Sequence, residues 1–252
     1  MAEAVLVTGG AKRIGREICL RLAKDGFSVF VHYRNSESES LELVDQIRSM
    51  GVDAESVRCD LSQSGAHSDL FSQCSEKMGP ITHLVNNASL FEHDDISTIS
   101  EDTWDSHMVV NARVQTMLIK SLAQGIPEGK TGSVVNILDQ KIDSPNPDHI
   151  SYTASRFTMW GMTKTLARAL APRIRVNAVA PGHTIASSEQ TPTGFRLAQS
   201  QSPLGFGPSP LDVAEAVSFL ISARTVTGQT IFVDAGERFL NRHRDVLFET
   251  ED

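Results

Sequence analysis

Short apolar runs recur along the chain, and each is followed by a longer stretch with a helical pattern. The apolar runs have the length and composition of buried strands, and they occupy residues 4–7, 28–33, 54–58, 83–86, 133–138, 175–180 and 230–233. Between them, apolar residues recur at the i, i+3, i+4 and i+7 spacing of amphipathic helices. One such face is formed by Ile14, Ile18, Leu22 and Ala23, and others lie within 41–47, 117–123, 157–170 and 213–220.

Strand–helix alternation at this spacing predicts parallel βαβ units with right-handed crossovers. We therefore expect one doubly wound (Rossmann) α/β domain over residues 1–240, with a seven-stranded parallel sheet and helices on both faces. Residues 182–210 lack strand character, and we expect them to form a substrate loop at the carboxyl edge of the sheet. The charged tail, residues 241–252, is either disordered or docked on a neighbouring subunit.

Composition restricts the classes of partner. The chain has 252 residues, 40% of them hydrophobic, and a net charge of −8, which argues against nucleic-acid or anionic-membrane partners. Cys19, Cys59 and Cys74 form no disulfide framework and no metal-ligand pattern, so no metal is expected. No signal peptide and no apolar run of the roughly 20 residues needed to span a bilayer is visible, so we expect a cytoplasmic protein.

The first apolar run leads into the glycine-rich segment Thr8-Gly9-Gly10-Ala11-Lys12-Arg13-Ile14-Gly15, which opens a helix. Gly9 permits a tight turn off the strand, and Gly15 permits close approach of the helix start to a pyrophosphate. Backbone N–H groups at the helix N-terminus form an anion site. The segment therefore predicts a dinucleotide-binding pocket.

The end of the second strand indicates which dinucleotide binds. Pockets specific for NAD place an acidic residue there, whereas a 2′-phosphate favours basic residues. Here the strand ends in His32-Tyr33-Arg34-Asn35-Ser36, with no acid before Glu37. Lys12, Arg13 and Arg34 would place three cations near one phosphate, which favours NADPH. The alternative is that they are ordinary surface charges.

Several further motifs follow in a fixed order: Asp60-Leu61, Asn86-Asn87-Ala88, Asn111, Tyr152-Thr-Ala-Ser-Arg156, Pro181-Gly182 and Val233-Asp234-Ala235-Gly236. With the phosphate loop, they make residues 4–240 resemble the short-chain dehydrogenase/reductase family. The resemblance implies hydride transfer between nicotinamide and a carbonyl or imine carbon, with Tyr152 as proton donor. It implies that Asp60 contacts the adenine and that Asn111 holds a water of the proton relay. The expected cofactor-binding residues are Gly9, Lys12, Arg13, Ile14, Gly15, His32, Tyr33, Arg34, Asp60, Leu61, Asn87, Ala88, Ser89, Tyr152, Arg156, Pro181 and Gly182.

The sequence departs from the family pattern at Arg156, where the family has a lysine four residues after the tyrosine. The i, i+4 spacing places both side chains on one helix face. Arginine keeps the positive charge that lowers the pKa of a neighbouring tyrosine. However, it is bulkier and cannot release its proton. Slower, retuned or lost catalysis are all compatible with this change.

A second departure is Asp139, thirteen residues before Tyr152, where the family usually has serine. An acid there is typical of the pteridine-reductase and dihydromonapterin-reductase branch, in which it pairs with the tyrosine to protonate a ring nitrogen. Ser89 and Phe91 resemble the same branch, whose phenylalanine stacks the pterin against the nicotinamide. The resemblance implies catalytic roles for Tyr152, Asp139, Arg156 and Asn111, and substrate contacts for Arg13, Ser89, Phe91, Asp139 and Tyr152.

The leading hypothesis is an NADPH-dependent reductase of a dihydropterin such as dihydrobiopterin, dihydromonapterin or dihydrofolate. A first alternative is a carbonyl reductase acting on ketoacyl or sugar substrates. A second is a catalytically weakened sensor or scaffold that binds NADPH or a pterin, which Arg156 favours. The resemblance also implies a homotetramer formed through helices within 99–126 and 151–171.

Overall fold

A single parallel sheet runs through the molecule. The computed structural model describes residues 3–187 and 190–250, and its seven strands lie in the order β3-β2-β1-β4-β5-β6-β7, all parallel. The strands are β1 (Ala4–Val7), β2 (Ser28–Tyr33), β3 (Ala54–Arg58), β4 (His83–Asn86), β5 (Gly132–Ile137), β6 (Ile174–Pro181) and β7 (Thr230–Val233). The predicted Rossmann fold is confirmed, and only β5 and β6 differ from the predicted strand bounds, by one residue at each end.

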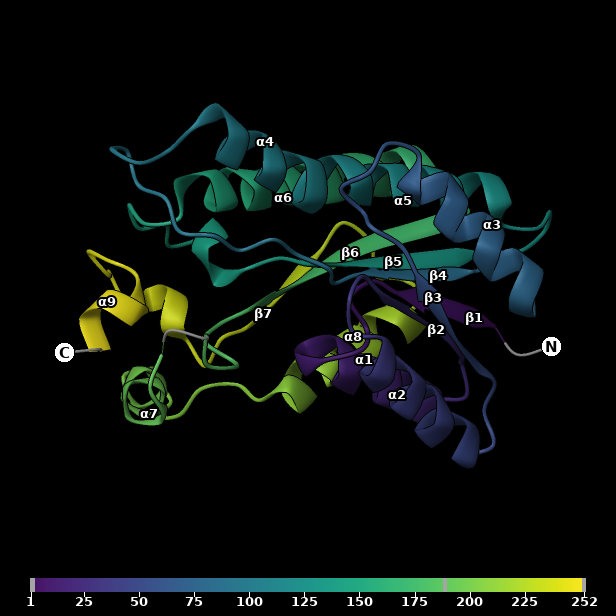
Figure 1. The fold of residues 1–252 in the computed structure, drawn as a ribbon, viewed down its shortest axis with the longest axis horizontal. Helices are drawn as coiled ribbons and strands as arrows, with labels where there is room; N and C mark the ends of the chain where they lie inside the picture. The colour runs from purple at the N-terminus through teal and green to yellow at the C-terminus, as the bar shows by residue number, and fades with distance from the viewer. Residues whose placement is uncertain (1–2, 188–189, 251–252) are drawn as a thin grey trace.

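Helices cover both faces of the sheet (Figure 1). One face carries α3 (Ala66–Met78), α4 (Glu101–Met108), α5 (Val114–Gly125) and α6 (Ile150–Leu170), and the other carries α1 (Arg13–Lys24), α2 (Glu37–Ser49) and α8 (Pro210–Ser222). Successive strand side chains point to opposite faces. Accordingly, Leu6 belongs to one apolar core, whereas its neighbours Val5 and Val7 belong to the other. The two cores hold the strand ends, and the loops that follow them, in fixed positions.

Among the described helices of nine or more residues, two were not foreseen from the sequence. One is α3, whose apolar face packs on the core through Leu70, Phe71 and Cys74. The other is α7 (Pro192–Ser200), which lies inside the expected substrate loop. The Thr191 hydroxyl accepts a hydrogen bond from the Gly194 N–H, and Pro192 occupies the first turn, a favourable helix start. Residues 188–189 of that loop lie outside the described residues.

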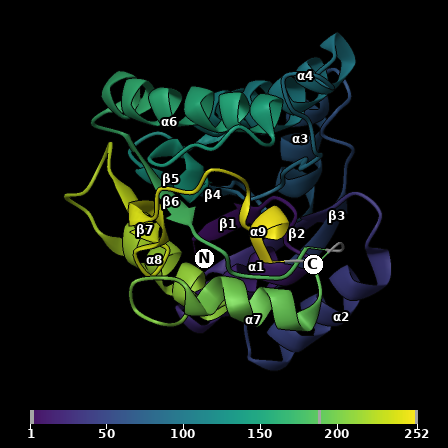
Figure 2. The same ribbon diagram turned by 90° about the vertical axis from the view of Figure 1, so that its left-hand side faces the viewer.

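The C-terminal segment folds back over the carboxyl edge of the sheet. After β7 it forms a 3₁₀ turn at Glu237–Phe239 and the short helix α9 (Val246–Thr250), which lies beside α7 (Figures 1 and 2). This segment therefore lies against its own chain as far as residue 250, and residues 251–252 of the predicted tail lie outside the described residues. Within the described ranges, no helix is long and apolar enough to cross a membrane.

Candidate functional site

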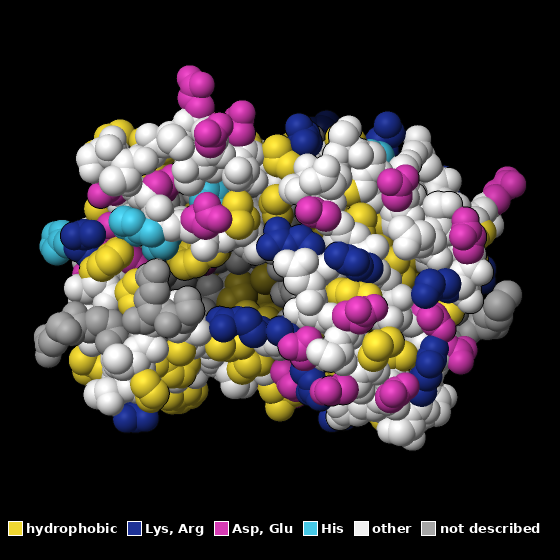
Figure 3. Space-filling model, viewed as in Figure 1, with side chains coloured by type: hydrophobic (Ala, Val, Ile, Leu, Met, Phe, Trp, Pro, Cys, Tyr) yellow, Lys and Arg dark blue, Asp and Glu magenta, His cyan; other side chains and the backbone are white. Residues whose placement is uncertain are grey.

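A cavity of about 680 Å³ lies at the carboxyl edge of the sheet. Figure 3 shows a hollow on this face, bordered by Lys and Arg side chains. The cavity is lined by the loop after β1, by the ends of β2 to β6 and by the C-terminal segment. Every residue expected to bind cofactor or substrate, or to take part in catalysis, lines it except Tyr33 and Asn111.

The phosphate loop is built for close backbone approach. Gly9 has a φ of +60°, a left-handed conformation that glycine adopts without strain. A Cβ at Gly15 would lie 2.2 Å from the Gly9 carbonyl oxygen, so no side chain fits there. The Asn87 amide donates to the Thr8 and Gly9 carbonyls at 2.9 and 3.0 Å and fixes the loop. Because no side chain caps the start of α1, its first N–H groups can meet an anion, and the cradle fits a pyrophosphate.

His32 positions the phosphate loop as a neutral side chain. Its Nδ1 accepts a hydrogen bond from the Gly9 N–H, and its Nε2 lies 3.0 Å from the Cys59 carbonyl, to which it donates. Burial lowers the pKa of His32 to about 4, outweighing the opposing effects of the Cys59 carbonyl and Asp60. His32 therefore holds β1, β2 and β3 together at the cavity without adding positive charge.

The cations at this end of the cavity are Lys12, Arg13 and Arg34. Lys12 forms an ion pair of 2.5 Å with Glu39. Arg13 has a φ of +54° and donates to the carbonyls of Ile185 and Ala186 at 3.4 and 3.2 Å, so it links the phosphate loop to the segment after β6. Arg34 is exposed at the end of β2. The three come from two loops and face one cavity, which is the arrangement expected for a 2′-phosphate site.

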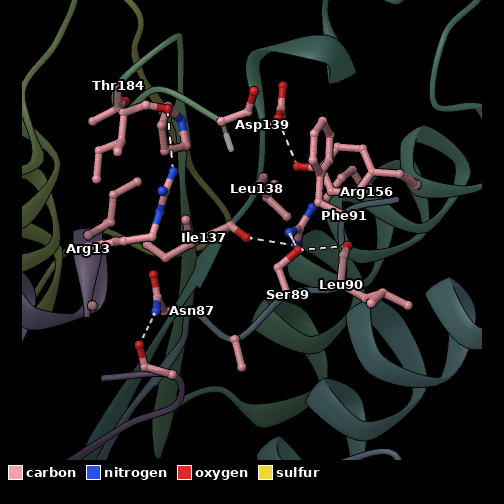
Figure 4. Close-up of a pocket in the computed structure, with 18 of the residues that line it drawn as sticks. Arg13, Asn87, Ser89, Leu90, Phe91, Ile137, Leu138, Asp139, Arg156 and Thr184 are labelled. Carbon is pink, nitrogen blue, oxygen red and sulfur yellow. Dashed lines mark hydrogen bonds between the residues drawn. The ribbon is translucent and has the colours of Figure 1, made fainter. Parts of the chain in front are cut away.

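Tyr152 and Asp139 form a hydrogen-bonded pair at the other end of the cavity. The Tyr152 hydroxyl, in the first turn of α6, donates to Asp139 Oδ2 at 2.8 Å, and Asp139 follows β5 (Figure 4). Burial raises the pKa of Tyr152; Arg156 opposes this rise and Asp139 adds to it, leaving the pKa above its ordinary value. Tyr152 is therefore a neutral phenol that can donate a proton.

Arg156 lies one helical turn after Tyr152 and is 3% exposed. Its guanidinium donates to the Ser89 hydroxyl and, at 3.2 Å, to the Ile137 carbonyl. The guanidinium carbon is 4.8 Å from the centre of the Tyr152 ring. Its Nε is buried and has no hydrogen-bond partner in the part of the chain that the structure describes.

Asn111 and Tyr33 lie behind the cavity wall. Asn111 sits in a π-helical turn, Val109–Arg113, a feature that often occurs at functional sites. It is fully buried, accepts from the Leu90 N–H at 2.8 Å and donates to the Leu90 carbonyl at 2.9 Å. The hydroxyl of Tyr33 donates to Glu37 at 3.3 Å, while its ring packs in the core. In these positions both side chains hold the elements that line the cavity.

Phe91 forms an aromatic surface beside the proton-donating pair. The residue is 48% exposed, and its ring stacks on His149 with centroids 4.2 Å apart and meets Tyr152 edge-on at 4.7 Å. Several lining residues were not foreseen from the sequence, because they lie in loops and the tail, where no periodic pattern marks them: Lys141, Asn146, His149, Glu237, Arg242, Asp245, Val246 and Leu247.

Comparisons with known proteins agree with this fold. The family model described as short chain dehydrogenase matches residues 3–192. The 3-oxoacyl-[acyl-carrier-protein] reductase FabG of Staphylococcus epidermidis is 30% identical over 241 residues, covering 94% of this chain and 99% of the relative.

Two solved structures are similar over most of their length. FolM Alternative dihydrofolate reductase 1 from Brucella canis, complexed with NADP, shares 39% identity at a TM-score of 0.89, covering 94% of this chain and 95% of that one. The angucycline C-6 ketoreductase LanV with bound NADP shares 28% identity at a TM-score of 0.87, covering 94% and 96%. The bound NADP in both confirms the prediction of this cofactor. The chain belongs to the short-chain dehydrogenase/reductase family.

Proposed function

We propose that this protein is an NADPH-dependent reductase of a dihydropterin, acting on the C=N bond of the reduced ring. The observation that carries the proposal is the hydrogen bond from Tyr152 to Asp139, in a cavity that Phe91 also lines. A carbonyl substrate needs one proton donor for its oxygen. An imine nitrogen is activated by protonation, and a carboxyl group paired with a phenol can deliver that proton.

The cofactor would be held by the phosphate loop, with Lys12, Arg13 and Arg34 at its 2′-phosphate. When bound, NADPH supplies a hydride for the imine carbon. Tyr152 and Asp139 supply the proton for the adjacent nitrogen. Arg156 keeps a positive charge against Tyr152, which favours the tyrosinate that forms when the proton leaves. General acid catalysis of this kind contributes roughly 10²–10⁴ in rate.

Phe91 supports a flat heterocyclic substrate. Phe91 is 48% exposed and lines the cavity, and its ring stacks on His149. A planar ring buries well against such a surface, and a stacked aromatic pair is worth about 0.5–1.5 kcal/mol beyond its buried area. Arg13 lies across the cavity, where it can contact both a cofactor phosphate and a polar ring edge.

The deciding experiment follows absorbance of the nicotinamide band when the purified protein is mixed with NADPH and a panel of substrates. Dihydrobiopterin, dihydromonapterin and dihydrofolate represent the imine class, and acetoacetyl thioesters and ketoses represent the carbonyl class. We expect turnover of at least one dihydropterin at a kcat/KM far above that of any carbonyl compound. Turnover of ketones alone would refute the proposal.

The second candidate is a carbonyl reductase, favoured by the similarity to FabG and LanV across 94% of the chain. The same substrate panel separates the two. Binding of NADPH with no turnover of either class would instead indicate a sensor or scaffold, with Arg156 as the inactivating change.

We also propose the family's tetramer for this chain. Trp104 on α4 and Phe157 on α6 are 40% and 38% exposed, large apolar side chains on the two helices expected at the interface. Light scattering of the purified protein should give four times the chain mass.

A further inference from the structure

The C-terminal segment closes the substrate end of the cavity. We propose that Val246 and Leu247 form the outer wall of the substrate site and contact the substituent projecting from the substrate ring. Two salt bridges, called clamps below, hold in place the C-terminal segment that carries these two residues. This inference rests on the proposed function for the identity of the substrate. It adds specificity-determining residues from a segment that carries none of the family motifs.

The first clamp joins the tail to the loop that carries Asp139. Asp245 Oδ2 lies 2.6 Å from Lys141 Nζ, and both residues are buried. Burial opposes ionisation of Asp245, but the Lys141 ammonium, the Leu247 N–H and His149 together outweigh burial and lower the pKa of Asp245. Lys141 also donates its backbone N–H to Asp139 Oδ1 at 2.9 Å. One residue therefore contacts both the tail and the proposed acid.

The second clamp joins the tail to the start of α6. The Arg244 guanidinium meets both carboxylate oxygens of Asp148, with Nε to Oδ2 and Nη2 to Oδ1 each at 2.8 Å. The Asp245 N–H adds a bond of 2.6 Å to Asp148 Oδ2. Two-point contacts of this kind fix geometry as well as adding energy. Asp148 directly precedes His149, which supports Phe91, so the tail is anchored beside the aromatic surface.

A third contact joins the tail to α7. Arg242 donates to Gln201 at 2.9 Å and to Glu249 at 2.7 Å, and α9 lies next to α7 in both ribbon views (Figures 1 and 2). The tail thus bridges the segment after β6 and the loop after β5. It crosses the outer end of the cavity, the side away from the phosphate loop.

Val246 and Leu247 are the uncharged members of the tail that line the cavity, where Asp139 and His149 also contribute. Val246 is 5% exposed and Leu247 is partly buried. Apolar side chains at this place exclude water from the Tyr152–Asp139 pair. They also give the substrate an apolar contact beyond the ring that Phe91 supports.

The test compares the double variant Val246→Ala/Leu247→Ala with His243→Ala, an exposed residue of the same tail that does not line the cavity. Removing two apolar contacts should raise KM for the dihydropterin about tenfold. The Kd for NADPH, followed by nucleotide fluorescence, should stay within twofold of the wild-type value, and His243→Ala should change neither. An unchanged KM, or an equal loss of NADPH affinity, would overturn the wall assignment.

A second measurement is independent of turnover. Asp245→Asn removes the charge that binds Lys141, so the tail should open more often and trypsin should cleave after Arg242 and Arg244 several times faster than in wild type. Bound NADPH and substrate together should slow cleavage of the wild type more than NADPH alone. Equal cleavage rates in the variant would reject the clamp. No dihydropterin turnover by wild-type protein would instead reject the proposed function, and KM for the carbonyl substrate that is turned over would then test the wall.

Discussion

Tyr152 donates a 2.8 Å hydrogen bond to Asp139, although one residue lies in the first turn of α6 and the other follows β5. The pair forms because consecutive strand and helix meet at the carboxyl edge of a parallel sheet, where ligands bind in this architecture. Arg156, one turn along the same helix, sets the charge around the phenol. The chemistry proposed above depends on these three side chains.

Tyr152→Phe should lower kcat by roughly 10²–10⁴, the usual value of a general acid. Nucleotide affinity should change little, because the phosphate loop lies at the other end of the cavity. The matched control is Tyr33→Phe, which changes the only other tyrosine at a position outside the cavity. Stopped-flow measurement of NADPH oxidation gives the rate, and undiminished turnover by Tyr152→Phe would refute its role as acid.

Asp139→Asn keeps an oxygen that can accept the Tyr152 hydrogen bond but removes the titratable carboxyl group. We expect a loss of roughly 10²-fold or more in dihydropterin reduction, measured as kcat/KM across pH. Asp143→Asn is the control, since Asp143 lies outside the cavity and forms an ion pair of 3.6 Å with Arg238. Equal dihydropterin reduction by Asp139→Asn would refute a role for Asp139 in proton delivery.

The Ser89–Arg156 hydrogen bond predicts energetic coupling between the two residues. Hydrogen bonds to charged groups are worth about 1.5–3 kcal/mol. Ser89→Ala should lower kcat/KM because it removes the hydroxyl to which Arg156 donates. Arg156→Lys should also lower kcat/KM, because a single ammonium cannot reach both Ser89 and the Ile137 carbonyl. The fold-loss in kcat/KM of the double variant should be smaller than the product of the fold-losses of the two single variants. The difference corresponds to a coupling energy of about 1 kcal/mol or more. Strict additivity would show that the contact has no role in catalysis.

Arg34→Ala should reduce the preference for NADPH over NADH. A charge-assisted contact to a phosphate is worth enough to raise the Kd for NADP about tenfold, whereas the Kd for NAD, which lacks that phosphate, should not change. Arg48→Ala provides the control, because Arg48 pairs with Glu55 away from the cavity. Calorimetric titration with both nucleotides measures the ratio.

Glu237 should make stability depend on pH. Burial raises its pKa from 4.5 to about 7, outweighing the His183 N–H and Arg242. The folded state holds the Glu237 proton more tightly than the unfolded state. The contribution of Glu237 to the free energy of unfolding is therefore fully present below pH 4.5 and is lost as pH rises toward 7. At about 1.36 kcal/mol per unit, the loss is on the order of 3 kcal/mol. Urea titrations measure the free energy of unfolding of Glu237→Gln and of the wild type. The value for the variant minus that for the wild type should therefore increase from pH 4.5 to 7. Glu249→Gln, which changes a more exposed carboxyl group of the same tail, is the control.

His32 acts in the opposite direction over a similar range. Its pKa falls from 6.5 to about 4 on folding, so its stabilising contribution is complete above pH 6.5 and is lost as pH falls through 4. The His32 contribution cancels when the free energies of unfolding of Glu237→Gln and wild type are subtracted, because His32 is present in both proteins. A flat difference across this range would contradict the burial assigned to Glu237.

The sequence by itself determined the sheet, most helices and the phosphate loop, whereas the pairing of Asp139 with Tyr152 was implied by the resemblance to the pteridine-reductase branch. The first three features depend on local periodicity or on short motifs, such as apolar runs and the positions of Gly9 and Gly15. Local patterns specify local structure because strand and helix periods are set by backbone geometry.

The tertiary structure alone decided how distant polar groups meet. Arg156 reaches Ser89 across 67 residues, and Arg244 reaches Asp148 across 96. Neither contact leaves a periodic signal, since an ion pair or a hydrogen bond needs only one residue at each end and any loop length between. For the same reason, the sequence indicated a charged tail but could not show that Asp245, Val246 and Leu247 line the cavity.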